Sequence, residues 1–550
     1  MRLIQFLPVI VAMVAISASS ASADDLPELP DVPEAPVAEP KVDAPKPAAP
    51  VMPVATSEHK SNSIFDKTSI SFSFADDNLL RDPGETRRNS PEAYFGQQGI
   101  SALDRVEESA YRRSESKLNI YKQFKVGKWR PEGGLKLRFG PDADGKYNLK
   151  DDGTFIKLNF EPNPTTAAWL MLYPIDSDKM RLGYHYDISW GGSNIFPKNF
   201  RKGLVPGAQL GFKVGVVDGF VGMKTALIRS PSETILETHG GNSNQFVERA
   251  YYGALGGLGV EFVQGLRLDL SGGYFEKGTN TKPGVLGKPI VSGGGSAQLS
   301  YKTGGKVGNK LDLRLYLENP EAAPLPDDSN YTTDFGFEAA LEGTALVQTL
   351  ADPDRYRSTR NEWSKAAYFS TGVRFQKLRI HLDTIYRELT YIVFNVPGFD
   401  PYNAVLEDAA LTPELFGSLS VDYFIESLGL TPALTVGVLM PSTFKPTVSG
   451  VKVAGPYAEE VSSGLQKVVV RGTNAGDWDI LPVGEEEMMV FLAKFNLKLN
   501  IGSNFFVIGE VSYGRDPNFA QVVLDERGHA IRKFDDPDNI GFGAIAEFIF

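Results

Sequence analysis

The sequence predicts an all-β protein whose strands close into a transmembrane antiparallel β-barrel, with a proline-rich arm at its N-terminus. Three observations support this fold class: an export signal at the start of the chain, a period-two alternation of apolar and polar residues from Thr68 to the end, and connections that are alternately short and long. A strand in such a barrel shows every second side chain to lipid. We expect about 16 to 20 strands, with about 18 favoured, because closed single-chain barrels have an even number.

The first 23 residues have the pattern of a signal peptide. Arg2 precedes an apolar run from Leu3 to Ile16, and small residues lead to Ala23 before two acids. We expect cleavage after Ala23, because the run is too short for a spanning helix and lacks a basic stop-transfer cluster. The chain has no cysteine, which excludes a lipoprotein anchor, a disulfide framework and a thiol zinc site in the mature protein.

Residues 24–60 are predicted to be a disordered arm. From Leu26 to Pro53 a proline occurs every second to fourth position and bulky apolar side chains are almost absent. Such a composition cannot bury a core and favours an extended, semi-rigid spacer. A second interpretation is that this arm contacts the cell wall or a periplasmic protein.

The remainder, residues 61–550, is predicted to be the barrel. The clearest alternation places Tyr184, Tyr186, Ile188 and Trp190 on one face, which we expect to meet lipid, with His185, Asp187 and Ser189 facing the lumen. The other predicted strands are Ile70–Phe74, Leu135–Phe139, Ala208–Val216, Leu266–Tyr274, Leu311–Leu317, Phe335–Leu341, Ala367–Phe375, Leu378–Tyr386, Phe491–Leu499 and Phe505–Tyr513.

Short and long connections are expected on opposite rims. Short turns at Val217–Gly219 and Gln376–Lys377 contrast with long stretches at Glu388–Pro413 and Pro441–Glu487, an asymmetry typical of bacterial transmembrane barrels with long extracellular loops. The alternation loses phase across Asn319–Ser364. Either a strand there has been missed, or one long connection lies on the rim of the short turns.

The last strand runs from Gly541 to Phe550, with Phe548 and Phe550 on its apolar face. This end resembles the C-terminal assembly signal of Gram-negative outer-membrane β-barrel proteins, although Ile545 stands where that signal usually has glycine. From about Thr68 to Phe550 the chain is similar in architecture to porin-like barrels. The resemblance implies the cell outer membrane as location, and outer-membrane lipid, lipopolysaccharide and the barrel assembly machinery as partners. It brings no particular solute with it.

Charged and polar residues between the apolar positions are the candidates for lining the lumen. Their signs are mixed, so most are expected to pair and brace the wall, whereas rings of one sign would set selectivity. The candidates are Lys136, Arg138, Arg181, His185, Asp187, Lys213, Arg267, Asp269, Asp312, Arg314, Arg374, Arg379, His381 and Asp383.

Enzymatic chemistry has little support in the sequence. His185-x-Asp187 and His381-x-Asp383 each place two polar groups on one side of a strand. An outer-membrane protease also uses an Asp-His pair two apart, but in the reverse order, and no partner acid pair is identifiable. We expect no enzyme, no catalytic residue, no metal and no cofactor. The net charge of -12 and the lack of a basic stripe argue against a nucleic-acid partner.

The favoured hypothesis is a porin-like channel that lets small hydrophilic solutes or ions pass through a polar lumen narrowed by one or more inserted loops. One alternative is a gated or plugged exporter or importer, for instance for polysaccharide. Another is a structural or adhesive barrel. An outer-membrane hydrolase is the last alternative.

Overall fold

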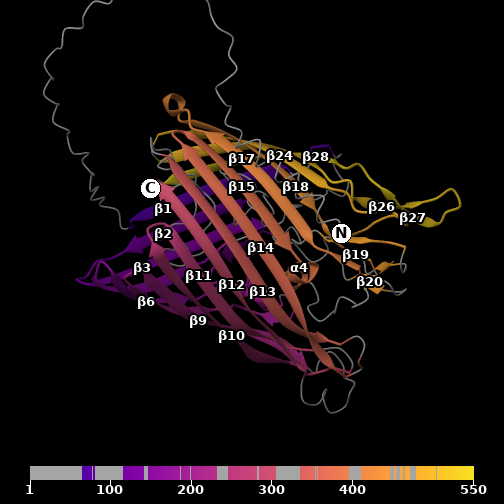
Figure 1. The fold of residues 1–550 in the computed structure, drawn as a ribbon, viewed down its shortest axis with the longest axis horizontal. Helices are drawn as coiled ribbons and strands as arrows, with labels where there is room; N and C mark the ends of the chain where they lie inside the picture. The colour runs from indigo at the N-terminus through magenta and orange to yellow at the C-terminus, as the bar shows by residue number, and fades with distance from the viewer. Residues whose placement is uncertain are drawn as a thin grey trace, which may run out of the picture. The chain divides into compact units, whose positions relative to one another are not determined.

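The chain divides into residues 1–61 and residues 62–550, and only the second unit is described below (Figure 1). The predicted signal peptide and arm lie outside the described residues. The computed structural model describes residues 65–550 except 77–78, 81–114, 142–146, 186–187, 198–199, 232–245, 281–283, 305–334, 353–354, 356, 396–409, 446–450, 454–458, 462–464, 471–477 and 503.

The described strands form one closed antiparallel barrel of 18 staves, which confirms the predicted fold class. We call each strand position in the ring a stave. Segments β4 and β5 both pair with β3, one after the other, and together occupy one stave. Segments β7 and β8 do the same against β9. The first staves are β1 (Lys67–Asp76), β2 (Glu115–Gln123), β3 (Trp129–Pro141), β4 (Tyr147–Asp151) with β5 (Phe155–Asn163), β6 (Thr166–Tyr173), β7 (Arg201–Lys202) with β8 (Gly207–Val214), β9 (Val217–Pro231) and β10 (Phe246–Val263).

The ring continues through the C-terminal half and closes on itself. The remaining staves are β11 (Leu266–Thr279), β12 (Pro289–Gly304), β13 (Gly336–Ala351), β14 (Thr359–Phe375), β15 (Leu378–Arg387), β17 (Glu414–Tyr423), β18 (Leu430–Met440), β24 (Val490–Asn500), β25 (Phe505–Arg515) and β28 (Asp538–Ile549). Strand β28 pairs with β1, and Thr68 and Phe550 exchange two backbone hydrogen bonds at 3.1 and 2.8 Å. The last residue therefore takes part in closing the ring.

The alternation of the sequence corresponds to the two faces of the wall. In β1, Phe72 and Phe74 are each 50% exposed on the outer face, whereas Ser69 and Ser71 are 3% and 6% exposed on the inner face. An outer surface of exposed apolar side chains around a closed ring of strands satisfies the requirements of a lipid bilayer, because every ladder bond is made within the ring. The barrel is therefore built to span a membrane.

One long connection lies on the rim that carries the short turns. Gly304 at the end of β12 pairs with Gly336 at the start of β13, next to the short β10–β11 turn. The connection between these strands therefore starts and ends on the same rim as the chain end, which accounts for the phase break in the sequence. The second of the two expected explanations is correct, and the predicted strand Leu311–Leu317 lies outside the described residues.

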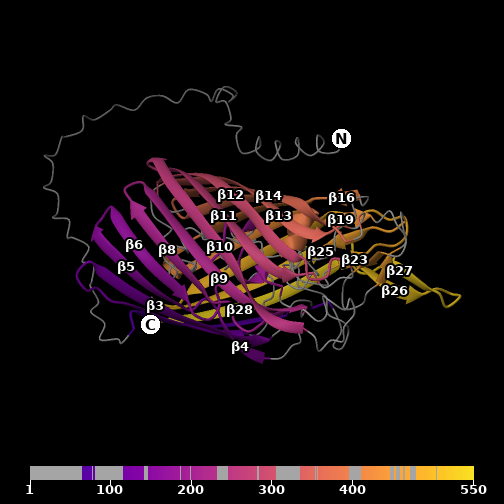
Figure 2. The same cartoon turned by 90° about the horizontal axis from the view of Figure 1, so that it is seen from below.

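The other rim carries small elements beyond the barrel wall (Figures 1 and 2). They are a four-stranded sheet of β16 (Ala410–Thr412), β19 (Ser442–Lys445), β22 (Val468–Val470) and β23 (Trp478–Ile480), a pair β20 (Val451–Val453) and β21 (Glu459–Val461), and the hairpin β26 (Ala520–Leu524) and β27 (Ala530–Phe534). The described helical segments are η5 (Ser193–Ile195), α4 (Leu389–Asn395) and η8 (Glu426–Leu428). Within the described part of the chain, no helix has the length and apolarity to cross a membrane.

The segment with the clearest alternation is not a strand of the wall. Leu182 and Trp190 pair only with each other, in an isolated antiparallel bridge between the end of β6 and the start of β7. Tyr184, Ile188 and Trp190 are between 0% and 4% exposed, not turned to lipid. The predicted outward orientation of these three residues is wrong, and Tyr186 and Asp187 lie outside the described residues.

Candidate functional site

The segment between β6 and β7, residues 174–200, enters the barrel and is here named the lumen segment. Its backbone is bound by side chains that point inward from the wall. Gly183 N donates to Ser271 Oγ of β11 at 3.1 Å, and the indole nitrogen of Trp190 donates to Ser296 Oγ of β12 at 3.1 Å. An irregular segment inside a barrel needs such partners, because it cannot satisfy its backbone with regular ladders.

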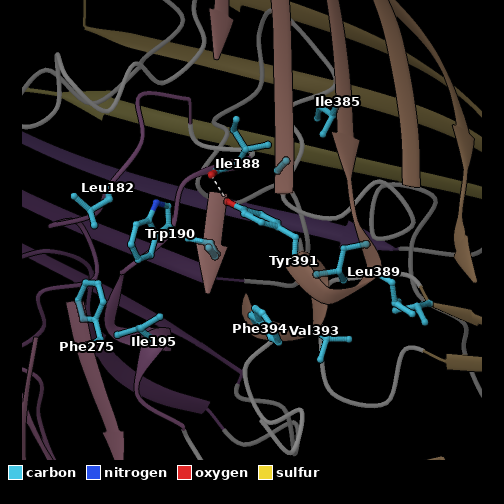
Figure 3. Packing of buried hydrophobic residues seen from close by; sticks show 14 of the residues in the cluster. Leu182, Ile188, Trp190, Ile195, Phe275, Ile385, Leu389, Tyr391, Val393 and Phe394 are labelled. Atoms are coloured by element: carbon cyan, nitrogen blue, oxygen red, sulfur yellow. Dashed lines mark hydrogen bonds between the residues drawn. The ribbon is translucent and has the colours of Figure 1, made fainter. Parts of the chain in front are cut away.

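Glycines in the wall make room for the lumen segment. A Cβ at Gly222 of β9 would lie 3.0 Å from Met180 Sδ, and one at Gly273 of β11 would lie 2.6 Å from a Leu182 methyl carbon. Phe275 meets the edge of Trp190 with ring centroids 5.7 Å apart, and Figure 3 shows these rings beside Leu182 and Ile195. The segment therefore lies in close apolar contact with the inner face of β9 to β11.

A second segment reaches the same place from across the barrel. Counted from β1, the lumen segment joins the fifth and sixth staves, whereas α4 lies between the thirteenth and fourteenth, β15 and β17. The Tyr391 hydroxyl of α4 donates a hydrogen bond to the Ile188 carbonyl (Figure 3). Two segments from nearly opposite walls thus meet inside the lumen, and we name them together the constriction.

The inner wall from β15 to β25 carries charged side chains in pairs. Arg379 of β15 contacts Asp422 of β17 at 2.8 Å, and Lys494 of β24 contacts Glu510 of β25 at 3.3 Å. The Arg379, Asp422 and Lys494 side chains have no measurable exposure. Pairing compensates the charges in a place where water hardly reaches them.

A surplus of positive charge gathers on β2 and β3. Lys117 of β2 lies 3.6 Å from Asp152, and Lys136, Arg138 and Lys179 also act electrostatically on this carboxylate. Four cationic side chains therefore act on Asp152, and one of them, Lys179 of the lumen segment, also acts on Asp178. The narrowed part of the lumen is more basic here than at the paired wall.

The predicted lumen residues fall into three groups. On wall strands, Lys136, Arg374, Arg379, His381, Asp269 and Asp383 are buried, Arg138 and Arg267 are partly exposed, and Lys213 is exposed. Arg181 and His185 belong to the lumen segment, while Asp187, Asp312 and Arg314 lie outside the described residues. Arg267 binds Asp218 and Asp269 at 2.6 and 2.8 Å, which is the bracing arrangement expected of mixed charges.

The two His-x-Asp pairs belong to different elements that meet in the lumen. The His185 ring stacks on Tyr368 of β14 with centroids 3.4 Å apart, and the Tyr368 hydroxyl donates to Asp383 of β15. Because His185 lies on the tip of the lumen segment, this contact fixes the tip to the far wall. Among the described residues, no group of three His, Asp or Glu side chains could hold a metal ion.

Sequence reasoning missed α4 and its contact with the lumen segment. The stretch from Glu388 to Pro413 was predicted to be a long loop, although it opens with the apolar run Tyr391–Phe394. All four of these side chains are buried. An apolar run inside a long connection was the available signal, because a solvated loop has no use for four consecutive bulky apolar residues.

One small cavity lies in the wall beside the lumen segment. Its volume is about 20 Å³, and its lining includes Trp169, Gln209 and Phe220. This is room for one or two waters. It is too small to be a solute site, so the candidate site is the constriction itself.

Comparisons with known proteins concern the fold. No family model and no curated protein matches the chain. Among solved structures it is similar to Pseudomonas aeruginosa OpdQ (9% identity, TM-score 0.38), Acinetobacter baumannii OccAB2 (9%, 0.39) and Pseudomonas aeruginosa OccK3, also called OpdO (10%, 0.38). Each alignment covers 88% of this chain and 96%, 97% and 94% of the other.

Proposed function

We propose that this protein is an outer-membrane channel through which small hydrophilic solutes or ions pass. The observation that carries the proposal is a closed 18-stave barrel, apolar outside and polar inside, whose lumen is narrowed by two segments that meet through Tyr391 and Ile188. A barrel of this size encloses more space than wall side chains alone can fill. The constriction then limits which solutes pass.

The basic cluster gives the proposed channel a preference for anions. Lys117, Lys136, Arg138 and Lys179 all act electrostatically on the carboxylate of Asp152, so an anion near this cluster would experience the field of four cations. On the wall from β15 to β25, Arg379 and Lys494 each lie beside one carboxylate. Groups of charged side chains of one sign set selectivity in a channel.

A second candidate is a gated version of the same channel. It is favoured by the burial of lumen-facing side chains: Arg374 and Arg379 are 0% exposed and Lys498 is 2% exposed. In a wide water-filled pore, side chains on the inner face would be accessible to solvent. The resting lumen is therefore narrow, and passage of a larger solute such as a polysaccharide would require part of the lumen to open.

The barrel supports an outer-membrane location, with lipid as its first partner. The outer face would contact outer-membrane lipid and lipopolysaccharide. Phe548 and Phe550 lie exposed on the outer face of the closing strand, where the assembly machinery could bind them as a C-terminal signal. We also propose that residues 24–60 form a spacer that reaches the cell wall or a periplasmic protein. We assign no catalytic role to the His-x-Asp pairs, because His185 and Asp383 each contact Tyr368.

The proposal is tested with the full-length protein in planar lipid bilayers. The expected result is discrete current steps with a reversal potential on the anion side of a salt gradient. Liposome swelling in sugars of increasing size would give the size of the largest solute that passes the channel. The gated candidate would be favoured if the protein showed no conductance in bilayers but liposomes containing it swelled when a ligand that opens the channel was added. Recovery of the protein as a soluble periplasmic monomer would contradict both.

A further inference from the structure

Two buried charges on the wall are bound to the backbone of the lumen segment. Lys224 of β9 is 1% exposed and donates to three carbonyl oxygens: those of Ser177 at 3.0 Å, Met180 at 2.6 Å and Gly191 at 2.7 Å. An ammonium has three donors. All of them are therefore used on the lumen segment.

The three carbonyls lie on both legs of the segment. Ser177 and Met180 precede the bridge between Leu182 and Trp190, and Gly191 follows it. Lys224 therefore closes the neck of the segment, where its two legs come together against the wall. A hydroxyl at this position could satisfy only one carbonyl and could not hold both legs.

Glu342 of β13 binds the tip of the same segment, at Tyr184 and His185. It accepts hydrogen bonds from backbone N–H groups, whereas Lys224 donates to backbone carbonyls. Its two carboxylate oxygens accept the backbone N–H groups of Tyr184 at 2.9 Å and His185 at 2.8 Å. Gln298 of β12 orients this carboxylate by donating to it at 3.1 Å. Glu342 is 1% exposed, so its charge acts on these amides and not on solvent.

We propose that Lys224 and Glu342 are positioning residues that clamp the lumen segment at its neck and tip, and that this clamp sets the conductance of the channel. The inference rests on the proposed channel function. The two residues do not contact the solute, because their charged groups are buried beneath the segment that they hold.

Backbone chemistry explains why charges are used. A segment without regular structure leaves carbonyl and amide groups that must find partners away from water. Charged partners form stronger hydrogen bonds than neutral ones. One cation for the carbonyls of the neck and one anion for the amides of the tip satisfy five backbone groups with two side chains.

The test uses Lys224→Met in the full-length protein, with Lys125→Met as the control. Lys125 is an exposed lysine in the turn between β2 and β3. We expect the Lys224→Met barrel still to fold, as judged by heat-resistant mobility on a gel. Its conductance should be at least about twofold higher than that of the wild type, with frequent flicker. Lys125→Met should leave conductance and noise close to those of the wild type.

A second measurement does not depend on current. Hydrogen exchange of peptides covering residues 176–193 should quicken in Lys224→Met and in Glu342→Leu, and remain unchanged in Lys125→Met. A Met180→Cys and Gly222→Cys pair, joined by a short bis-methanethiosulfonate reagent, should return the Lys224→Met channel to wild-type conductance. The sequence has no other cysteine, so the reagent has one target.

The outcomes are separable. If the wild type carries no current, the proposed channel function fails, and exchange still decides whether the clamp exists. If the wild type conducts and Lys224→Met changes neither exchange nor conductance, the clamp is overturned. If Lys224→Met does not fold, Glu342→Leu carries the same test at the tip.

Discussion

Two stretches of the inner wall differ in the contacts that their inward side chains make. On β9 and β11 the inward positions include Gly222 and Gly273, and the lumen segment packs on them with the apolar side chains of Met180 and Leu182. From β15 to β25 the inward positions hold ion pairs such as Arg379 with Asp422. The first stretch is a docking surface inside the barrel, and the second is a braced wall. A polar lumen is therefore not uniform, and its glycines indicate where a segment is held.

The largest expected effect lies in the braced wall. Arg379→Met should destabilise the barrel by about 3 to 5 kcal/mol, because it leaves the buried Asp422 carboxylate without its partner. The double variant with Asp422→Leu should recover most of that loss. Denaturant unfolding in detergent micelles checks both. Equal stability of Arg379→Met and wild type would show that the pair is not buried in the membrane-inserted protein.

The docking surface is tested by adding a side chain to its glycines. Gly273→Val should destabilise the constriction by about 1 to 3 kcal/mol, because a Cβ there would lie 2.6 Å from a Leu182 methyl carbon of the lumen segment. Gly343→Val on β13 is the matched control, since a Cβ at Gly343 meets nothing within 4 Å. Hydrogen exchange of the lumen segment measures the difference. Similar exchange in both variants would contradict the docking role of Gly273.

The wall strands could be predicted from the sequence, whereas the lumen segment could not. Strands such as β1 and β15 were predictable because lipid requires apolar residues at every second position. At Leu182–Trp190 the same alternation led to a wrong prediction of a lipid-facing wall strand. A segment that packs one side against an apolar inner wall shows the same pattern as a strand with one side in lipid. The role of Lys224 could not be predicted, because its three carbonyl partners depend on a fold of the lumen segment that no local pattern encodes.

The basic cluster offers a smaller effect, on selectivity rather than stability. Lys136→Gln combined with Arg138→Gln should lower the anion-to-cation permeability ratio by about two- to threefold, because it removes two of the four cations that act on Asp152. Lys128→Gln, which removes an exposed charge from the β2–β3 turn, should change it little. Reversal potentials in a salt gradient give the ratio. If Lys128→Gln changed the permeability ratio more than the double variant does, selectivity would be set by charges at the rim and not by the basic cluster.

The smallest effect concerns a loop far from both regions, the turn between β26 and β27. Hydrogen bonds from the backbone N–H of His529 and Arg527 lower the pKa of Asp525 below its ordinary value of 3.8. A lowered carboxyl pKa stabilises the turn above the ordinary value, and this contribution is lost as pH falls through the lowered one. Protection of the Arg527 and His529 amides should decline with acid. Asp525→Ala should be less protected throughout and nearly independent of pH, with conductance unchanged.

The most direct test of the central claim is the single-channel current of the full-length wild-type protein in a planar bilayer under a salt gradient. A constricted channel predicts small, discrete steps and a reversal potential of the anion-selective sign. Currents as large as those of an unobstructed barrel would contradict the constriction. A silent bilayer, with protein demonstrably inserted, would contradict the channel.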